Sequence, residues 1–555
     1  MSPITLSRNL VNTLLVIAVA VAFADASIVV LAVPEIMNDF DVGVQSASWV
    51  VTAYNLAVVV AGIALIWLVR HMRVTTLAAI GFTVCGLASV GCALTQSIWP
   101  LATLRGVQGV GAAALLVASL PLLQRSAGGA RPWILAATIG MAAGPALGGL
   151  LTEFFSWRSI FIVQAPLVAI GIVALAGASM PPATVERLLP ERPQGFALAA
   201  LAALSAALVG ALFLVIVLLI AGLSWDPLPA ALVATTLPVL ALASDRLARR
   251  LPDVAAAVSG CVLVAGGLAG LGFLPDDHTV LIVAALALCG VGLGLASHPI
   301  GERAFGHPPT LADGNNGVIT RHAGLVVGLL VVVALLAGSL DDLQSRAEVV
   351  TGKTILESPV PLQQKIPVML ELATAGDPER ARPPDVEAIF NRHGAETDPE
   401  LRELRDTIVD EVEELVIRTF RGPFLVCALF GLVAAAASFG LGAAREEAGR
   451  RRTLTAAVAA LAAVAVLLVA DFALGALDDP VDSADPCESP IEVSGEGPEA
   501  ALQQAALSLL TNAACNSGSS RSELLQRALS GDSSAVPGLP PLPPGLLPPG
   551  GPPIP

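Results

Sequence analysis

The residues best able to carry chemistry are two charges inside long apolar runs. Asp25 lies in the run 10–33, and Arg105 lies in the run 100–123. A guanidinium stays charged in such surroundings and therefore needs a partner. A carboxylate beside it can switch by protonation, because desolvation favours the neutral acid whereas a neighbouring cation favours the ionised form. The pair is a candidate proton-coupling device; a static ion pair that only fixes two helices is the alternative.

The elements that must hold this pair are helices that cross a membrane. Of the 555 residues, 55% are hydrophobic and 14% are charged, whereas a soluble domain averages about 25% charged residues. A run of about 20 mainly apolar residues crosses the hydrocarbon core as a helix, and such runs predict thirteen crossings. They are residues 10–33, 46–68, 76–96, 100–123, 132–152, 158–178, 197–223, 228–247, 254–274, 278–298, 314–339, 421–444 and 453–475. At about 1.5 Å per residue, Asp25 and Arg105 lie roughly 13 Å and 8 Å below the outer ends of their helices, so a contact is feasible.

Arginines between the runs predict the side of the membrane on which each loop lies. Cytoplasmic loops are enriched in Lys and Arg, and alternate loops carry them. They are Arg70 and Arg73; Arg125 and Arg131; Arg187 and Arg192; Arg246, Arg249 and Arg250; Arg303; and Arg445 with Arg450, Arg451 and Arg452. We therefore expect a multi-pass protein of the cell membrane with a cytoplasmic N-terminus and an extracellular C-terminus. The first run is expected to remain in the protein as a signal anchor.

The order of the runs divides the chain into two halves of equal helix number, as in many transporters that work by alternating access. We predict an all-α membrane protein of two six-helix bundles, one extra C-terminal transmembrane helix and an extracellular helical insert. The parts are 1–178, the N-terminal bundle; 179–196, a cytoplasmic connector; 197–340 and 421–444, the C-terminal bundle; 341–420, the insert; 445–475, a basic cytoplasmic loop and the thirteenth helix; and 476–555, an acidic, Pro-rich extracellular tail.

Most of the net charge of −15 lies in two of these segments. Residues 341–420 include 18 acidic and 9 basic side chains, and residues 476–555 include 10 and 2. Both segments should therefore lie outside. The insert has apolar residues at helical spacing, which predicts an amphipathic helix: Leu401, Leu404, Ile408, Val412 and Leu415. In the tail, Cys487 and Cys515 would meet an oxidising compartment, and we expect a disulfide between them.

A second motif is rich in small residues and lies in the run 132–152. Its members are Gly140, Gly144, Pro145, Gly148 and Gly149. Gly140, Gly144 and Gly148 are four residues apart and share one helix face, which allows close approach of another helix. Pro145 can also bend the helix. We interpret this face as a rocking contact; ordinary small-residue packing is the alternative.

Several of these segments resemble motifs of the major facilitator superfamily. Residues 101–113 resemble its "RxxQGxGAA" motif, and residues 140–149 resemble its "GxxxGPxxGG" antiporter motif. Residues 25–34 and 157–161 are similar to parts of helices 1 and 6 in the drug:proton antiporters with fourteen helices. The resemblance implies a facilitator fold and proton-driven export of drugs, lipids or other amphipathic compounds, with Asp25 and Arg105 near the coupling site.

Shorter likenesses supply further candidates. Residues 245–250 resemble the cytoplasmic "DRxGRR" motif, and residues 321–324 resemble "RQxG". The loop-motif candidates are Asp245, Arg246 and Arg249, and the candidates to line a cavity are Gln108, Gln164, Arg321 and His322. Glu153 and Arg158 flank one outer turn, and we expect them to pair. The chain departs from the family where Ile66, Arg70 and Arg73 replace the usual Gly, Asp and Gly, and where the two central helices of the fourteen-helix branch have no counterpart.

These patterns favour secondary transport over catalysis. The sequence has no P-loop, which disfavours an ATP-driven pump, and no His-rich metal cluster within the runs. We expect no catalytic residue, no metal and no cofactor beyond a proton gradient. The expected partners are a small-molecule substrate, the lipid bilayer and an envelope partner for the insert or tail, but no nucleic acid. Two alternatives stay open: a degenerate facilitator that acts as a receptor or scaffold, and a proton-coupled importer.

Overall fold

The computed structural model describes most of the chain up to residue 443. The described residues are 8–68, 72, 74–127, 131–166, 195–274, 278–305, 311–375 and 384–443. Three predicted features lie outside them, namely the body of the connector, the thirteenth helix at 453–475, and the tail with Cys487 and Cys515. The chain divides into two compact units. The bundle unit holds the described residues up to Leu340 and from Val416 onward, and the insert unit holds those between Asp341 and Leu415.

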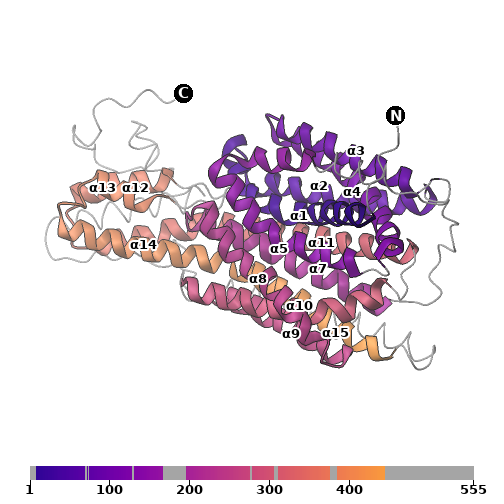
Figure 1. The fold of residues 1–555 in the computed structure, drawn as a ribbon. Helices are drawn as coiled ribbons and strands as arrows, with labels where there is room; N and C mark the ends of the chain where they lie inside the picture. Colours follow the sequence, from indigo (N-terminus) through magenta and orange to yellow (C-terminus); the bar gives the residue numbers. More distant parts are fainter. Residues whose placement is uncertain are drawn as a thin grey trace. The chain divides into compact units, whose positions relative to one another are not determined.

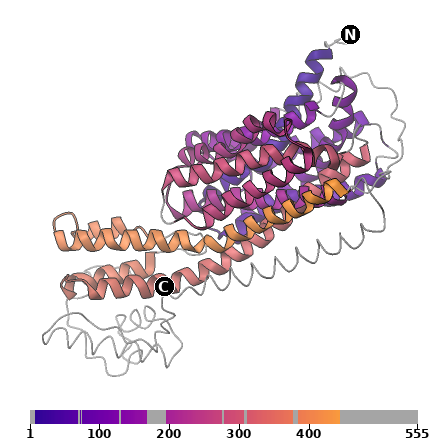
Figure 2. The same cartoon turned by 90° about the horizontal axis from the view of Figure 1, so that it is seen from below.

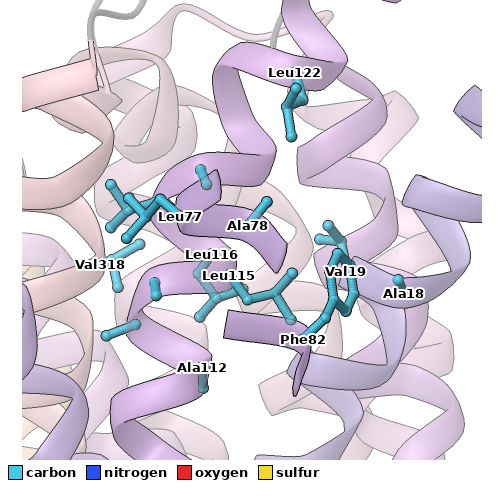
Figure 3. Packing of buried hydrophobic residues seen from close by; sticks show 14 of the residues in the cluster. Ala18, Val19, Leu77, Ala78, Phe82, Ala112, Leu115, Leu116, Leu122 and Val318 are labelled. Carbon is cyan, nitrogen blue, oxygen red and sulfur yellow. The ribbon is translucent and has the colours of Figure 1, made fainter. Parts of the chain in front are cut away.

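The first half of the bundle unit begins with five long helices followed by a shorter segment. The helices are α1 Arg8–Phe40, α2 Val44–Leu68, α3 Val74–Ala93, α4 Ile98–Ala127 and α5 Arg131–Phe154. After α5 the chain bends by 119° into the helix Trp157–Pro166. Figure 1 shows α1 to α5 lying side by side. Figure 3 shows part of their core, in which Phe82 and Leu115 pack near Ala18 and Val19.

The second half of the bundle unit repeats this plan. Its helices are α7 Gly195–Ile216, α8 Pro227–Ala248, α9 Asp253–Gly272, α10 Thr279–Phe305, α11 Leu311–Glu357 and α15 Arg421–Ala443. A π-helical segment, Val217–Gly222, extends α7. α7 packs against α10 and α15, and α9 packs against α10 and α15. Figure 2, turned by 90°, shows that the bundle is built from long helices running alongside one another.

The apolar composition predicted from the sequence is present in helices long enough to span a membrane. Among the described residues, ten helices meet this condition, or up to eleven if the bent pair Ala143–Phe154 and Trp157–Pro166 forms one span. The predicted span 158–178 is described only as far as 166, and each of the others up to 444 overlaps a helix. The predicted all-α fold is confirmed for the described part of the chain.

Glycine contacts hold α1 against α5, because the two backbones touch. A Cβ atom at Gly140 would collide with the carbonyl oxygen of Ala20, and one at Gly144 would collide with Ser27 and the carbonyl of Ala24. Gly149 faces away from α1 and meets Ala231 of α8. Pro145, which follows Gly144, is buried in the same helix. The predicted small-residue face therefore packs against the helix that carries Asp25.

The same contacts recur in the second half. Gly324 and Gly328 of α11 meet Ala202 and Ala206 of α7, as Gly140 and Gly144 of α5 meet α1. Likewise, Gly290 of α10 meets the carbonyl of Leu237, as Gly109 of α4 meets that of Tyr54. The pair α9 and α10 also repeats the pair α3 and α4. Gly260 meets Gly292 there, as Gly81 meets Gly111 in the first half. These contacts fix the register between the halves: Ala207 corresponds to Asp25, Leu286 to Arg105 and Cys289 to Gln108.

The insert unit is helical and has its own apolar core. It consists of the end of α11, α12 Leu362–Ala375, α13 Val386–Arg392 and α14 Pro399–Thr419 up to residue 415. Leu401, Leu404, Ile408 and Val412 are buried along α14, as the helical spacing predicts. Lys365 is buried as well, and its ammonium donates to the carbonyls of Leu356 and Ser358 at 2.8 and 2.7 Å. It therefore caps the C-terminal end of α11.

Candidate functional site

Asp25 and Arg105 meet at the centre of the first half. α1 places Asp25 toward α4, and Nη1 of Arg105 lies 2.9 and 2.8 Å from its two carboxylate oxygens. The side chains of Arg105 and Asp25 are 0% and 4% exposed, so neither charge is hydrated by bulk water. Removing two charges from water costs several kcal/mol each unless close pairing and further hydrogen bonds offset the loss. The surroundings of the pair must therefore supply those bonds.

Besides Asp25, Arg105 contacts groups on α2, on its own helix α4 and on the helix Trp157–Pro166. Its Nε donates to the carbonyl of Val50 on α2 at 3.0 Å, and its Nη1 donates to Oε1 of Gln108 at 2.6 Å. The Tyr54 ring lies with its centroid 4.4 Å from Cζ, and the Phe161 ring lies 5.7 Å away. A cation over an aromatic face is stabilised by the ring quadrupole, more strongly when water is excluded. Arg105 is thus fixed in direction as well as neutralised.

Asp25 receives hydrogen bonds from neutral amides in addition to the guanidinium. Nε2 of Gln164 donates to its Oδ1 at 2.7 Å, and Nε2 of Gln108 lies 3.4 Å from the same atom. The two amides are also joined, because Nε2 of Gln108 donates to Oε1 of Gln164 at 2.7 Å and to Oγ of Ser89 at 2.9 Å. We call Asp25, Ser89, Arg105, Gln108 and Gln164 the polar cluster. Every member is buried, and together they come from α1, α3, α4 and the helix Trp157–Pro166.

A pocket of about 40 Å³ adjoins the polar cluster inside the first half. Its lining combines four cluster members with apolar and small residues: Ala18, Val21, Ala22, Asp25, Tyr54, Phe82, Cys85, Gly86, Ser89, Gln108, Leu115 and Gln164. Gln108 and Gln164 thus line a cavity. Pockets for drug-sized ligands measure about 300 to 1,000 Å³, so this pocket is of the size for water rather than for cargo.

The second half packs in the same way without these charges. Ala207, Leu286 and Cys289 occupy the positions equivalent to Asp25, Arg105 and Gln108, and all three are buried. Apolar side chains therefore suffice for the helix contacts at these positions. The polar cluster is an addition to one half of a repeated scaffold.

Residues 15–340, more than half of the chain, match the family model for the Major Facilitator Superfamily. The chain belongs to the Major Facilitator Superfamily. A structural relative supports the same fold: a bacterial homolog of the human lysosomal transporter Spinster, solved in an inward-facing and occupied conformation. It superposes with a TM-score of 0.53 at 15% identity, covering 79% of this chain and 97% of that chain.

Curated relatives of this facilitator include drug exporters, each matched over part of its length. Multidrug resistance protein Stp of Mycobacterium tuberculosis is 39% identical over 155 residues, 27% of this chain and 29% of the relative. Drug efflux pump JefA of the same species is 35% identical over 163 residues, 28% and 32% of the two chains. Riboflavin transporter RibZ of Clostridioides difficile is 31% identical over 172 residues, 30% and 37%. The chain thus spans about a third of these relatives.

Other predicted site residues of the facilitator lie away from the polar cluster. Arg321 of α11 has its Cζ 5.1 Å from the centroid of the Phe23 ring, where the second half meets α1. His322 is buried, with Nδ1 2.8 Å from the carbonyl of Val318. Neither lines the pocket beside Asp25. In the predicted loop motif, Asp245 and Arg249 pair within one helical turn at the exposed end of α8, and Arg246 is exposed next to them.

The expected pair of Glu153 and Arg158 was wrong. Arg158 instead pairs with Asp39 at the end of α1, at 2.8 Å, and Trp157 donates to the same carboxylate at 3.1 Å. Glu153 accepts from the backbone N–H of Leu228 at 3.3 Å, at the start of α8 in the second half. The 119° bend between the helices turns the two side chains toward different neighbours. Glu153 therefore joins the two halves.

Three contacts of the polar cluster were missed by sequence reasoning. Ser89 and Tyr54 belong to or cover the polar cluster, and the carbonyl of Val50 accepts from Arg105. A polar residue within an apolar run was a signal for Ser89, and Tyr54 is the single tyrosine of the chain. The Val50 carbonyl has no sequence signal at all. Within the described ranges, no group of three His, Cys, Asp or Glu residues could hold a metal ion.

Proposed function

We propose that this facilitator exports a small lipophilic compound in exchange for protons, by alternating access of its two halves. The observation that carries the proposal is the polar cluster, in which a buried carboxylate lies against a buried guanidinium with amide donors around it. Such a carboxylate can be either protonated, or ionised and paired with the Arg105 guanidinium. Protonation of Asp25 would free Arg105 from its counter-charge and change which arrangement of the helices is favoured.

The difference between the halves favours coupling over a purely structural ion pair. A buried ion pair can often be replaced by apolar residues with no loss of stability, and sometimes with a gain. The second half has apolar residues at these positions, and its glycine contacts are the same. Stability alone therefore gives no reason to retain charges in the first half. A reversible protonation step would give such a reason, because it needs an ionisable carboxyl at this position.

The proposed direction of transport rests on similarity to exporters, and the proposed orientation in the membrane rests on the positions of the arginines. The relatives Stp and JefA are described as a multidrug resistance protein and a drug efflux pump, and the face 140–149 of α5 resembles the antiporter motif and packs directly on α1. The alternating arginines favour a cytoplasmic N-terminus in the cell membrane. Import of a nutrient would use the same fold in the other direction.

Proton-driven flux in inverted membrane vesicles tests the proposal. Ethidium, tetracycline and riboflavin serve as probes, with and without an imposed pH gradient. We expect gradient-dependent accumulation of at least one probe by the wild type and its loss in Asp25→Asn and Arg105→Ala. Leu286→Met, at the second-half position equivalent to Arg105, is the matched control and should transport normally, because it conserves volume in an apolar site.

Each other outcome points to a different function. Absence of proton-dependent flux in the wild type, for every probe and in both vesicle orientations, would contradict the proposal and favour a receptor or scaffold. Gradient-dependent flux in the opposite direction would favour import. Full flux in Asp25→Asn would show that the coupling proton binds elsewhere.

A further inference from the structure

The pocket beside Asp25 is elongated along the bundle. Ala18 precedes Asp25 by seven residues on α1, Phe82 precedes Ser89 by seven on α3, and Leu115 follows Gln108 by seven on α4. Seven residues correspond to about 10 Å along a helix. Because α4 runs opposite to α1 and α3, all three offsets lead toward the same end of the bundle, the end at which α1 begins. The pocket thus has a polar end at the cluster and an apolar end nearer that surface.

The pocket and the second half lie on different faces of α1. The Asp25 carboxylate is bonded by Arg105 and Gln164, inside the first half. Phe23, two residues earlier and so about 200° around the helix, contacts Arg321 of the second half. A proton that leaves Asp25 through the pocket therefore passes within the first half. It does not cross the surface at which the halves separate.

We propose that the pocket is the inner segment of a hydrated proton path that runs from Asp25 toward the end of the bundle where α1 begins. The inference rests on the proposed function, in which Asp25 carries the coupling proton and this end is cytoplasmic. Its volume of about 40 Å³ suits about three or four waters, since each needs roughly 10 to 15 Å³. The carboxylic O–H of Asp25 donates its proton to the first water, the water chain passes one proton outward, and the carboxylate left behind is neutralised by Arg105.

Polar groups are present where the waters need them. The first water can bond to Asp25, Ser89 and Gln108, which meets the two to four partners that a buried water requires. Farther along, the lining of this small pocket is apolar and includes Phe82, Leu115 and Ala18, which Figure 3 shows in the core of the first half. A narrow apolar stretch admits water but excludes a lipophilic cargo by size. The proton and the cargo would then use separate routes.

Infrared spectroscopy of the full-length protein in lipid nanodiscs tests this path without a cargo. The C=O stretch of protonated Asp25 is identified by subtracting Asp25→Asn, and the rate of its hydrogen–deuterium exchange is measured. Ala22→Leu fills the pocket from α1, and Leu115→Phe fills it from α4. We expect exchange to slow about tenfold or more in both variants, because the proton must wait for a local opening.

Matched controls separate a blocked path from general damage. Ile17→Phe adds bulk to the same helix at a side that is 41% exposed in the bundle, and its exchange should match the wild type. Radiolytic labelling reports the water directly: Cys85, which lines the pocket, should be oxidised faster than the buried Cys289, which occupies the position of Gln108 in the second half. Equal labelling of the two thiols would overturn the inference.

The two proposals fail in distinguishable ways. If Asp25 never shows a protonated band between about pH 4 and 9, a range that covers buried carboxyls, proton coupling through Asp25 fails and the path fails with it. If Asp25 titrates and its exchange is as fast in Ala22→Leu and Leu115→Phe as in the wild type, only the path is wrong. Slow exchange in both variants, with wild-type exchange in Ile17→Phe, supports the path.

Discussion

Arg105 is tolerated in the bundle because of the groups that surround it. Its side chain is fully buried and pairs with Asp25, a backbone carbonyl and an amide, between two aromatic rings. Among the described residues, none accepts a hydrogen bond from Nη2 of Arg105. A site that leaves one donor of a buried charge unused is not optimised for stability alone. This is consistent with a group whose bonding changes during a cycle.

Single and double substitutions separate the stability of this pair from its function. Arg105→Ala leaves a buried carboxylate without its counter-charge, and we expect it to lower the free energy of unfolding by about 3 to 5 kcal/mol. The double variant Asp25→Leu with Arg105→Leu imitates the apolar second half and should recover most of this loss. Thermal unfolding in detergent measures both. Transport should be absent in the double variant; transport at the wild-type level there would contradict a coupling role.

At the residue scale, the sequence identified the charges but not their full environment. Asp25 and Arg105 were found because a charge in an apolar run must have a partner. Ser89 and Tyr54 were not assigned to the site, because a hydroxyl in a helix can bond its own backbone and needs no distant partner. The pairing of Arg158 with Asp39 depends on a bend after α5 that no local pattern specifies. Long-range geometry decides such contacts.

At the scale of the elements, the closest helix contact of the first half is that of α5 with α1. Gly140→Ala would place a methyl group against the carbonyl of Ala20, and overpacking of this kind costs about 1 to 3 kcal/mol. We expect lower stability in chemical unfolding and reduced proton-driven flux in vesicles. Gly106→Ala on α4 is the control, because nothing lies within 4 Å of its added methyl. It should be neutral or stabilising by about 0.5 to 1 kcal/mol; an equal loss in both variants would contradict the close-contact explanation.

The insert unit has a charged contact between α12 and the end of α13. Oε2 of Glu371 lies 2.9 Å from Nε2 of His393, and Arg392 pairs with the same carboxylate. Burial alone would raise the pKa of Glu371, but the hydrogen bonds from His393 and Arg392 outweigh it and lower the pKa below its usual 4.5. A carboxyl with a lowered folded pKa contributes stability above its unfolded pKa and loses it as pH falls through the folded value.

Hydrogen exchange of α12 and α13 checks this contact. Protection should fall as the pH drops below 4.5, and Glu371→Gln should flatten that fall. Since the carboxylate is 35% exposed, the effect is small, at most about 0.5 kcal/mol. Glu387→Gln, an exposed residue of α13, is the control. An unchanged acid response in Glu371→Gln would show that other groups cause it.

Element boundaries were predictable where apolar periodicity was long. Eleven of the predicted spans overlap helices of the described chain, and the buried side of α14 is the one that the spacing of Leu401, Leu404 and Ile408 indicates. α11 differs, since it continues to Glu357 rather than ending near 339. The apolar run ends where the polar insert begins, but helix propensity continues through both, so hydropathy alone could not locate the helix end.

At the scale of the whole molecule, two similar halves differ in chemistry. The sequence predicted two sets of six helices from hydropathy and arginine positions, and the family match confirms the facilitator fold. The register between the halves could not be predicted, because it depends on which glycine meets which carbonyl across helices. That register shows that the charges of Asp25 and Arg105 have apolar equivalents in the second half. The asymmetry is the central reason for placing proton coupling in the first half.

Ligand-induced proton release tests this central claim most directly. A compound transported in the vesicle assay is added to the purified full-length protein in weakly buffered detergent solution, and a pH-sensitive dye records the protons released. We predict release in proportion to bound compound for the wild type and for Leu286→Met, and none for Asp25→Asn that still binds the compound. Binding without release by the wild type, or equal release by Asp25→Asn, would contradict the account.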